Sequence, residues 1–184
     1  MPLLMLKDLP RYDCILEVAR RFPDLDPTAC EAYLNILRAA DEVYRQSEGF
    51  FNANGLSPGR FTVLMLLYDK IAAEPIPLTP AELADRAGVT RATMTGLVDT
   101  LERDGLVRRD HDSGDRRMML VRVTAKGLGV IEGILPSHYR RLKELMEPLS
   151  QGERKTLVRL LNKVAAKAAT MAVETHEAAH AHPV

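Results

Sequence analysis

The sequence has no tryptophan, and aromatic residues make up only 5% of its 184 positions. Leucine, alanine, valine and methionine must therefore supply the packing, a composition that favours helices. Two cysteines, Cys14 and Cys30, cannot build a disulfide framework. The longest uncharged apolar run, Phe61 to Tyr68, has eight residues and is too short to span a bilayer. The N-terminus reaches Lys7 and Asp8 too early for a secretory signal, so we expect a cytoplasmic protein.

The chain also lacks net charge, because 25 Lys and Arg residues balance 25 Asp and Glu residues. This balance gives no sign of general polyanion binding, so any nucleic-acid surface must be local. A Gly-rich phosphate loop, a nucleophile elbow and an HExxH motif are all absent from the sequence. We therefore expect neither an enzyme nor a cofactor.

Signals for the start of a helix recur along the chain. Asp26, Ser57 and Thr79 each precede a proline, which is the pattern of an N-cap followed by proline at the first helical position. Thr79 and Ser150 are each followed three residues later by glutamate, as in a capping box. Apolar spacing predicts a long helix over about 27–51. Glycines that mark the expected helix ends stand at Gly55, Gly88 and Gly105.

Residues 79–104 have the form of a helix, a turn at Gly88 and a second helix that starts at Thr90. Such a pair is a helix-turn-helix unit, whose second helix fits the major groove of DNA. One face of the second helix is apolar: Met94, Leu97, Val98 and Leu101. Elsewhere it carries small or polar residues: Arg91, Ala92, Thr95, Gly96 and Asp99. A helix that reads base edges in the major groove needs an apolar back, which packs on the core, and a front of small or polar side chains, which can approach the bases.

A β-hairpin is predicted directly after this unit. Two β-type arms, Leu106–Arg109 and Met118–Val123, flank a polar tip at Ser113-Gly114. Residues 103–126 contain seven Lys and Arg against four Asp and Glu, an excess of three positive charges. Guanidinium groups on a projecting loop suit phosphate or the minor groove. We therefore predict a mainly α fold with a small β-hairpin wing, a winged helix-turn-helix.

The sequence resembles the MarR family of bacterial transcriptional regulators. The resemblance rests on Leu56-Ser57, on residues 78–109 and on residues 112–127, where the hairpin runs into Thr124-Ala-Lys-Gly127. It covers about residues 30–170 and implies a homodimer that binds a pseudo-palindromic DNA operator. More often than not such a regulator is a repressor, and many release DNA in response to a small aromatic acid, a phenol or an oxidant.

The resemblance also implies a division of the chain. It gives an N-terminal arm with a short helix at 1–25, a winged helix at 56–124, dimerisation helices at 26–55 and 125–175, and a tail at 176–184. Within the long-armed branch of the family, urate-responsive members use a tryptophan on the first long helix. This chain has none, which argues against urate.

In the family, the wing carries Asp, one residue, then Arg, and this motif falls on Asp115 and Arg117. Arg117 would enter the minor groove, braced by Asp115. Several relatives carry a basic residue where this chain has Gly96, so base reading would fall to Arg91, Thr93 or Thr95. Thr90 is expected to cap the helix. The predicted DNA-binding residues are Arg91, Ala92, Thr93, Thr95, Gly96, Asp115, Arg116 and Arg117.

Three other features leave alternatives open. Cys30 lies near the position where peroxide-sensing relatives place a reactive cysteine, which makes a redox-responsive regulator an alternative, but it also suits a buried small residue. His176 and His180 have a spacing able to hold zinc, but a third ligand does not stand out, and we predict no metal site. His138 fits either a ligand cavity or an exposed helix. The functional alternatives are a winged helix that docks a partner protein and a small-molecule enzyme.

Overall fold

In a computed structural model of the chain, residues 8–69, 74–111, 114–115 and 117–180 are described. The chain forms two units, Met1–Glu132 and Gly133–Val184. Across the described ranges, no helix has the length and apolar character that crossing a membrane requires.

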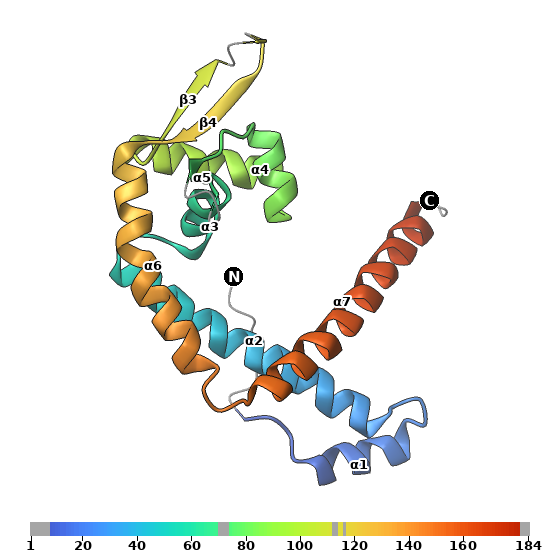
Figure 1. Ribbon diagram of the computed structural model, residues 1–184. Coiled ribbons are helices and arrows are strands. Elements are labelled where there is room, and N and C mark those ends of the chain that lie inside the picture. Colours follow the sequence, from blue (N-terminus) through green and yellow to red (C-terminus); the bar gives the residue numbers. More distant parts are fainter. Residues whose placement is uncertain (1–7, 70–73, 112–113, 116, 181–184) are drawn as a thin grey trace. The chain divides into compact units, whose positions relative to one another are not determined.

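The first unit is mainly helical, as predicted, and carries two short antiparallel hairpins (Figure 1). Its elements are α1 (Tyr12–Arg21), α2 (Pro27–Ala53), α3 (Pro58–Leu66), β1 (Tyr68–Asp69), β2 (Glu74–Pro75), α4 (Pro80–Ala87), α5 (Arg91–Arg103), β3 (Val107–His111) and β4 (Met119–Val123). Helix α6 (Ala125–Leu145) begins in this unit, and α7 (Gln151–His180) belongs to the second.

The helix starts follow the capping pattern of the sequence. The carboxylate of Asp26 accepts hydrogen bonds from the Thr28 hydroxyl and from the backbone N–H groups of Thr28 and Ala29, which lower the pKa of Asp26. At the start of α4, the Thr79 hydroxyl accepts from the Glu82 amide while the Glu82 carboxylate accepts from the Thr79 amide. Each cap satisfies amide groups that the first turn of a helix leaves unpaired.

Two segments differ from the sequence prediction. Helix α7 continues to His180, so the first five residues of the predicted tail, 176–180, are helical, and 181–184 lie outside the described residues. The tail carries alanines at 178, 179 and 181, alanine being the strongest helix former, and Pro183 is the first residue that breaks a helix. The hairpin β1–β2 was not predicted, because strands of two residues show no period-two pattern.

The hydrophobic core of the first unit lies between α3, α4, α5 and the base of the β3–β4 hairpin. Its side chains with no exposed surface include Val63, Leu64, Leu67, Leu83, Met94, Val98, Leu101 and Val121. Gly59 brings α3 close to α5, since a Cβ atom there would lie 3.2 Å from Leu97 Cδ2. Helix α1 packs against α2 and buries Ile15.

The β3–β4 hairpin is anchored at its base and extends beyond the helices (Figure 1). Its register runs from Val107 opposite Val123 to His111 opposite Met119. Val121 also exchanges both main-chain hydrogen bonds with Leu78, at 2.8 and 3.2 Å, so Leu78, two residues before α4, adds a third, one-residue strand. The wing is thus joined to the segment that leads into the helix-turn-helix.

The start of α6 closes the base of the hairpin. The Thr124 hydroxyl donates to the carbonyl oxygen of Gly105 at 2.8 Å. Gly127 lies so close to the turn that a Cβ atom there would be 2.1 Å from the Leu106 carbonyl oxygen. Any side chain at this position would push α6 away from the turn between α5 and β3.

We therefore predict that Gly127→Ala destabilises the protein by about 1–3 kcal/mol, because backbone atoms must move to admit the methyl group. Gly129→Ala is the matched control: a Cβ atom there meets nothing within 4 Å, and the gain in helix propensity is worth about 0.5–1 kcal/mol. Urea unfolding of both variants measures the difference. Equal stability of the two would mean that the close approach at Leu106 is absent.

Candidate nucleic-acid interface

Helix α5 has a fully buried back and an open front. Met94, Val98 and Leu101 have no exposed surface, and Leu97 is half-buried against α3. The front carries the exposed residues Arg91, Ala92, Thr93, Thr95, Gly96 and Asp99. A Cβ atom at Gly96 would meet nothing within 4 Å, so this surface is slim as well as open. Such a helix can approach the base edges of a major groove.

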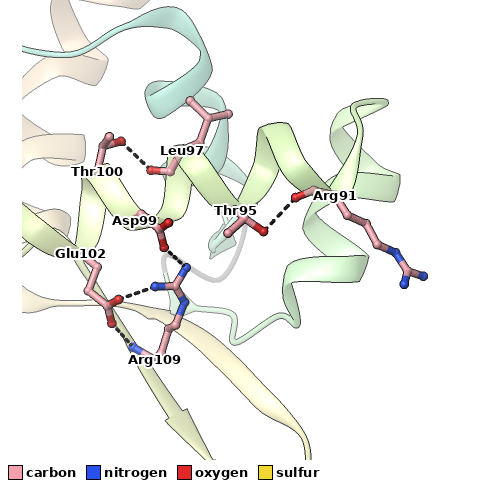
Figure 2. A network of polar contacts seen from close by, with 7 residues as sticks. All are labelled: Arg91, Thr95, Leu97, Asp99, Thr100, Glu102 and Arg109. Carbon is pink, nitrogen blue, oxygen red and sulfur yellow. Dashed lines mark hydrogen bonds and ion pairs between the residues drawn. The ribbon is translucent and has the colours of Figure 1, made fainter.

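The turn between α4 and α5 sets the direction of the exposed face of α5. Gly88 has φ 64°, in the left-handed region that favours glycine, and ends α4. Thr90 is the N-cap of α5, and its hydroxyl accepts a hydrogen bond from the Thr93 amide at 3.2 Å. The Thr95 hydroxyl donates to the Arg91 carbonyl oxygen at 2.9 Å, while the Arg91 side chain extends away from the helix (Figure 2).

The wing tip places the predicted aspartate and arginine together. The Asp115 carboxylate accepts a hydrogen bond from the backbone N–H of Arg117 at 2.9 Å, so it acts on the main chain of the loop. The side chains of Arg117 and Met118 are exposed. Arg116, the other predicted wing arginine, lies outside the described residues.

Part of the positive charge counted from the sequence is engaged in ion pairs and hydrogen bonds within the fold. Arg108 and Arg122 both contact the Asp110 carboxylate, at 3.2 and 3.4 Å. Lys126 Nζ donates to the Asp104 carbonyl oxygen at 2.8 Å. A count of charges along the chain therefore overstates what the wing offers to DNA.

Arg109 connects the hairpin to α5, whereas from the sequence it was predicted only as one of the positive charges of the hairpin region. Its guanidinium contacts the carboxylates of Asp99 and Glu102 on α5 (Figure 2). Burial works against the charged guanidinium, but the hydrogen bonds to Asp99 and Glu102 outweigh this effect and raise the pKa of Arg109. The signal in the sequence was a pair of carboxylates three residues apart on the predicted helix, followed by an arginine on the first hairpin arm.

The remaining candidates lie on separate helices. Cys30 is half-buried in the first turns of α2, and Cys14 is exposed on α1. His138 is half-buried on α6, and this burial lowers its pKa. His176 and His180 belong to the last turns of α7. Within the part of the chain that the structure describes, no group of three His, Cys, Asp or Glu side chains is arranged to hold a metal ion.

Two cavities lie within the first unit. One, of about 290 Å³, is lined by residues of the α2–α3 turn together with Asp104 and Lys126. The other, of about 260 Å³, lies between α1 and α2 and is lined by Tyr12, Ile15 and Glu31 among others. Both volumes lie just below the range of about 300–1,000 Å³ that is typical of small-molecule sites.

A helix with an open front, followed by an anchored hairpin with an exposed arginine, defines a winged helix-turn-helix of the DNA-binding class. The model of the MarR family matches residues 56–119. The HTH-type transcriptional repressor YetL of Bacillus subtilis (strain 168) is 38% identical over 156 residues, which cover 85% of this chain and 92% of YetL. The chain belongs to the MarR family of transcriptional regulators.

Solved structures share the fold. AbsC, a MarR family transcriptional regulator from Streptomyces coelicolor, superimposes with a TM-score of 0.71 over 79% of this chain and 97% of AbsC, at 20% identity. The PcaV transcriptional regulator from the same organism, solved in complex with its natural ligand, gives a TM-score of 0.59 over 71% of this chain and 91% of PcaV, at 26% identity.

Proposed function

We propose that this MarR-family regulator is a homodimeric repressor in the cytoplasm whose operator binding is modulated by a small-molecule effector. The observation that carries the proposal is the open front of α5, exposed from Arg91 to Gly96 except at the buried Met94, next to a wing whose tip exposes Arg117. Repression is supported by the similarity to the repressor YetL.

In this proposal the two elements take different parts of the duplex. Arg91, Thr93 and Thr95 read base edges in the major groove, where an arginine pairs with guanine and a threonine methyl contacts thymine. Ala92 and Gly96 keep the helix slim enough to approach. At the wing, Arg117 and its neighbour Arg116 engage phosphate or the minor groove, and Asp115 shapes the loop that presents them.

A dimer is supported by the exposed surface of α7. Over residues 151–171, every side chain except the half-buried Arg154 is exposed. Large apolar residues recur at helical spacing along this surface: Leu157, Leu160, Leu161, Val164 and Met171. An exposed apolar stripe of this length is typical of a protein–protein interface. Pairing it with a second copy would let two recognition helices meet successive major grooves about 34 Å apart.

We predict that the combined substitution of Leu161→Gln and Val164→Gln produces monomers and abolishes operator binding, because both residues belong to the apolar stripe of α7. Light scattering should give twice the chain mass of 20.5 kDa for the unaltered protein and for the control Lys163→Gln. The proposal of a dimer fails if the unaltered protein is monomeric at the concentrations at which it binds DNA.

The effector in this proposal is a small aromatic acid or phenol. Support comes from the family resemblance, from PcaV, which binds a natural ligand, and from the two cavities of the first unit. We predict that a hydroxylated benzoate from a small panel raises the melting temperature of the protein and lowers its affinity for the operator. Benzene analogues without the acid or hydroxyl groups serve as controls, and a full panel without effect on either measurement would remove this class of effector.

The DNA-binding proposal is tested by footprinting on the protein's own upstream region, followed by titration at several salt concentrations. We predict that Arg117→Ala weakens binding to all duplexes and lowers the slope of log affinity against log salt by about one unit, because one phosphate or groove contact is lost. Lys155→Ala on α7 removes one positive charge as a control and should leave the slope unchanged.

The same titrations separate DNA recognition from the alternative of a protein-docking winged helix. A DNA reader retains selectivity for one site while its affinity falls steeply with salt. Binding that shows no preference for any site over random duplex would contradict the proposal of an operator-binding regulator.

A further inference from the structure

The wing leaves α5 through a turn of three residues, 104–106, and only its base is packed against the helices. Val107, Leu120, Val121 and Val123 are buried there. Toward the tip, His111, Asp115, Arg117, Met118 and Met119 are exposed. Contacts made from the edge of the hairpin, in addition to its buried face, can therefore help to fix its direction.

Arg109 occupies an intermediate position on β3 and reaches back to α5. Its Nη2 lies 2.6 Å from Asp99 Oδ1, and its Nη1 donates to Glu102 Oε2. The other carboxylate oxygen of Glu102, Oε1, accepts a hydrogen bond from the backbone N–H of Arg109 at 2.9 Å. Glu102 therefore holds both the side chain and the main chain of one residue of the strand (Figure 2).

The hydrogen-bond pattern of the sheet explains why the backbone N–H of Arg109 contacts Glu102 and not β4. Val121, the partner of Arg109 in the register, exchanges its main-chain hydrogen bonds with Leu78 on the other side. In an antiparallel ladder, the N–H of Arg109 then points to the outer edge of the sheet, away from β4. The Glu102 carboxylate takes the place that a further strand would occupy, and it ties this edge to α5.

The pairing has the chemistry of a strong, directional contact. The side chain of Arg109 is 23% exposed and that of Glu102 is 37% exposed, so solvent screens the pair only partly. Hydrogen bonds in which the donor or the acceptor is ionised are shorter and stronger than neutral ones, and two of them accepted by one carboxylate also fix an angle. Removal of Glu102 would leave the half-buried guanidinium of Arg109 with Asp99 as its remaining carboxylate partner and would take the acceptor from the edge amide of the same residue.

We propose that Glu102 and Arg109 are positioning residues, which hold the wing at the angle at which Arg117 and the front of α5 contact one duplex together. The inference rests on the proposed DNA binding. A wing held in its bound direction loses less conformational freedom on binding than one that swings, and so binds more tightly. Neither residue needs to touch DNA for this effect.

The test is a double-mutant cycle on operator binding with Glu102→Ala and Arg117→Ala. Glu102→Ala removes a negative charge, which by electrostatics alone strengthens binding to DNA. We expect it instead to weaken operator binding about tenfold, because the wing loses its direction. The control Asp85→Ala, which removes an exposed carboxylate from α4, should leave the affinity unchanged or raise it.

The cycle distinguishes positioning from a purely structural role. If Glu102 acts through the wing, Arg117→Ala should cost less than about threefold once Glu102 is absent, since contacts that depend on each other are not additive. Additive losses, or an affinity of Glu102→Ala equal to or above that of the unaltered protein, would overturn the inference. If Glu102→Ala does not fold, Arg109→Lys, which keeps the charge but loses the planar fork, enters the same cycle.

A second measurement separates this inference from the proposed function. Amide hydrogen exchange of residues 117–121 should be faster in Glu102→Ala than in the unaltered protein without any DNA present. Failure of the unaltered protein to select an operator would contradict the proposed function, and this measurement would still decide whether Glu102 and Arg109 hold the hairpin. Unchanged exchange would show that Glu102 and Arg109 do not hold the hairpin.

Discussion

One side of α5 lies entirely in the core, because Met94, Val98 and Leu101 are fully buried. The arrangement of the rest of the winged helix depends on this burial. With the back of the helix fixed, its front can remain polar and slim without support from neighbours. The same core receives Val121 from the wing, so one set of apolar contacts joins both elements. Replacing buried groups of this size costs several kcal/mol, so the packing of α5 and of the hairpin base is tied to the stability of the domain.

Electrostatics in this domain works at the level of individual pairs. The Asp110 carboxylate forms ion pairs with Arg108 on the same strand and with Arg122 on the opposite strand. The Asp104 carbonyl oxygen accepts a hydrogen bond from Lys126. These cations serve the fold, whereas Arg91 and Arg117 are exposed where the proposed contacts with DNA lie. A chain without net charge can in this way present positive charge at Arg91 and Arg117 without attracting polyanions in general.

Local signals in the sequence predicted the helix-turn-helix and wing, because their causes lie within a few residues. The capping box of Thr79 and Glu82 and the left-handed Gly88 involve neighbours in the chain. The bridge between Leu78 and Val121 and the contacts of Arg109 with α5 were not predicted. They join segments that only the packed core brings together, and a charge pattern read along the chain cannot assign partners.

The anchors of the hairpin all lie in its basal half, from the Leu78 bridge to the contacts of Arg109. Among the described residues of the tip, the Asp115 carboxylate accepts a hydrogen bond from the backbone N–H of Arg117, and the Asp115 carbonyl oxygen accepts one from the backbone N–H of Met118. Insertions or deletions in the loop at the tip would therefore change how far an arginine projects without disturbing the hydrophobic interior. Under the proposed DNA binding, the length of this loop would set the reach of Arg117, whereas the contacts at the base of the hairpin would set its attachment.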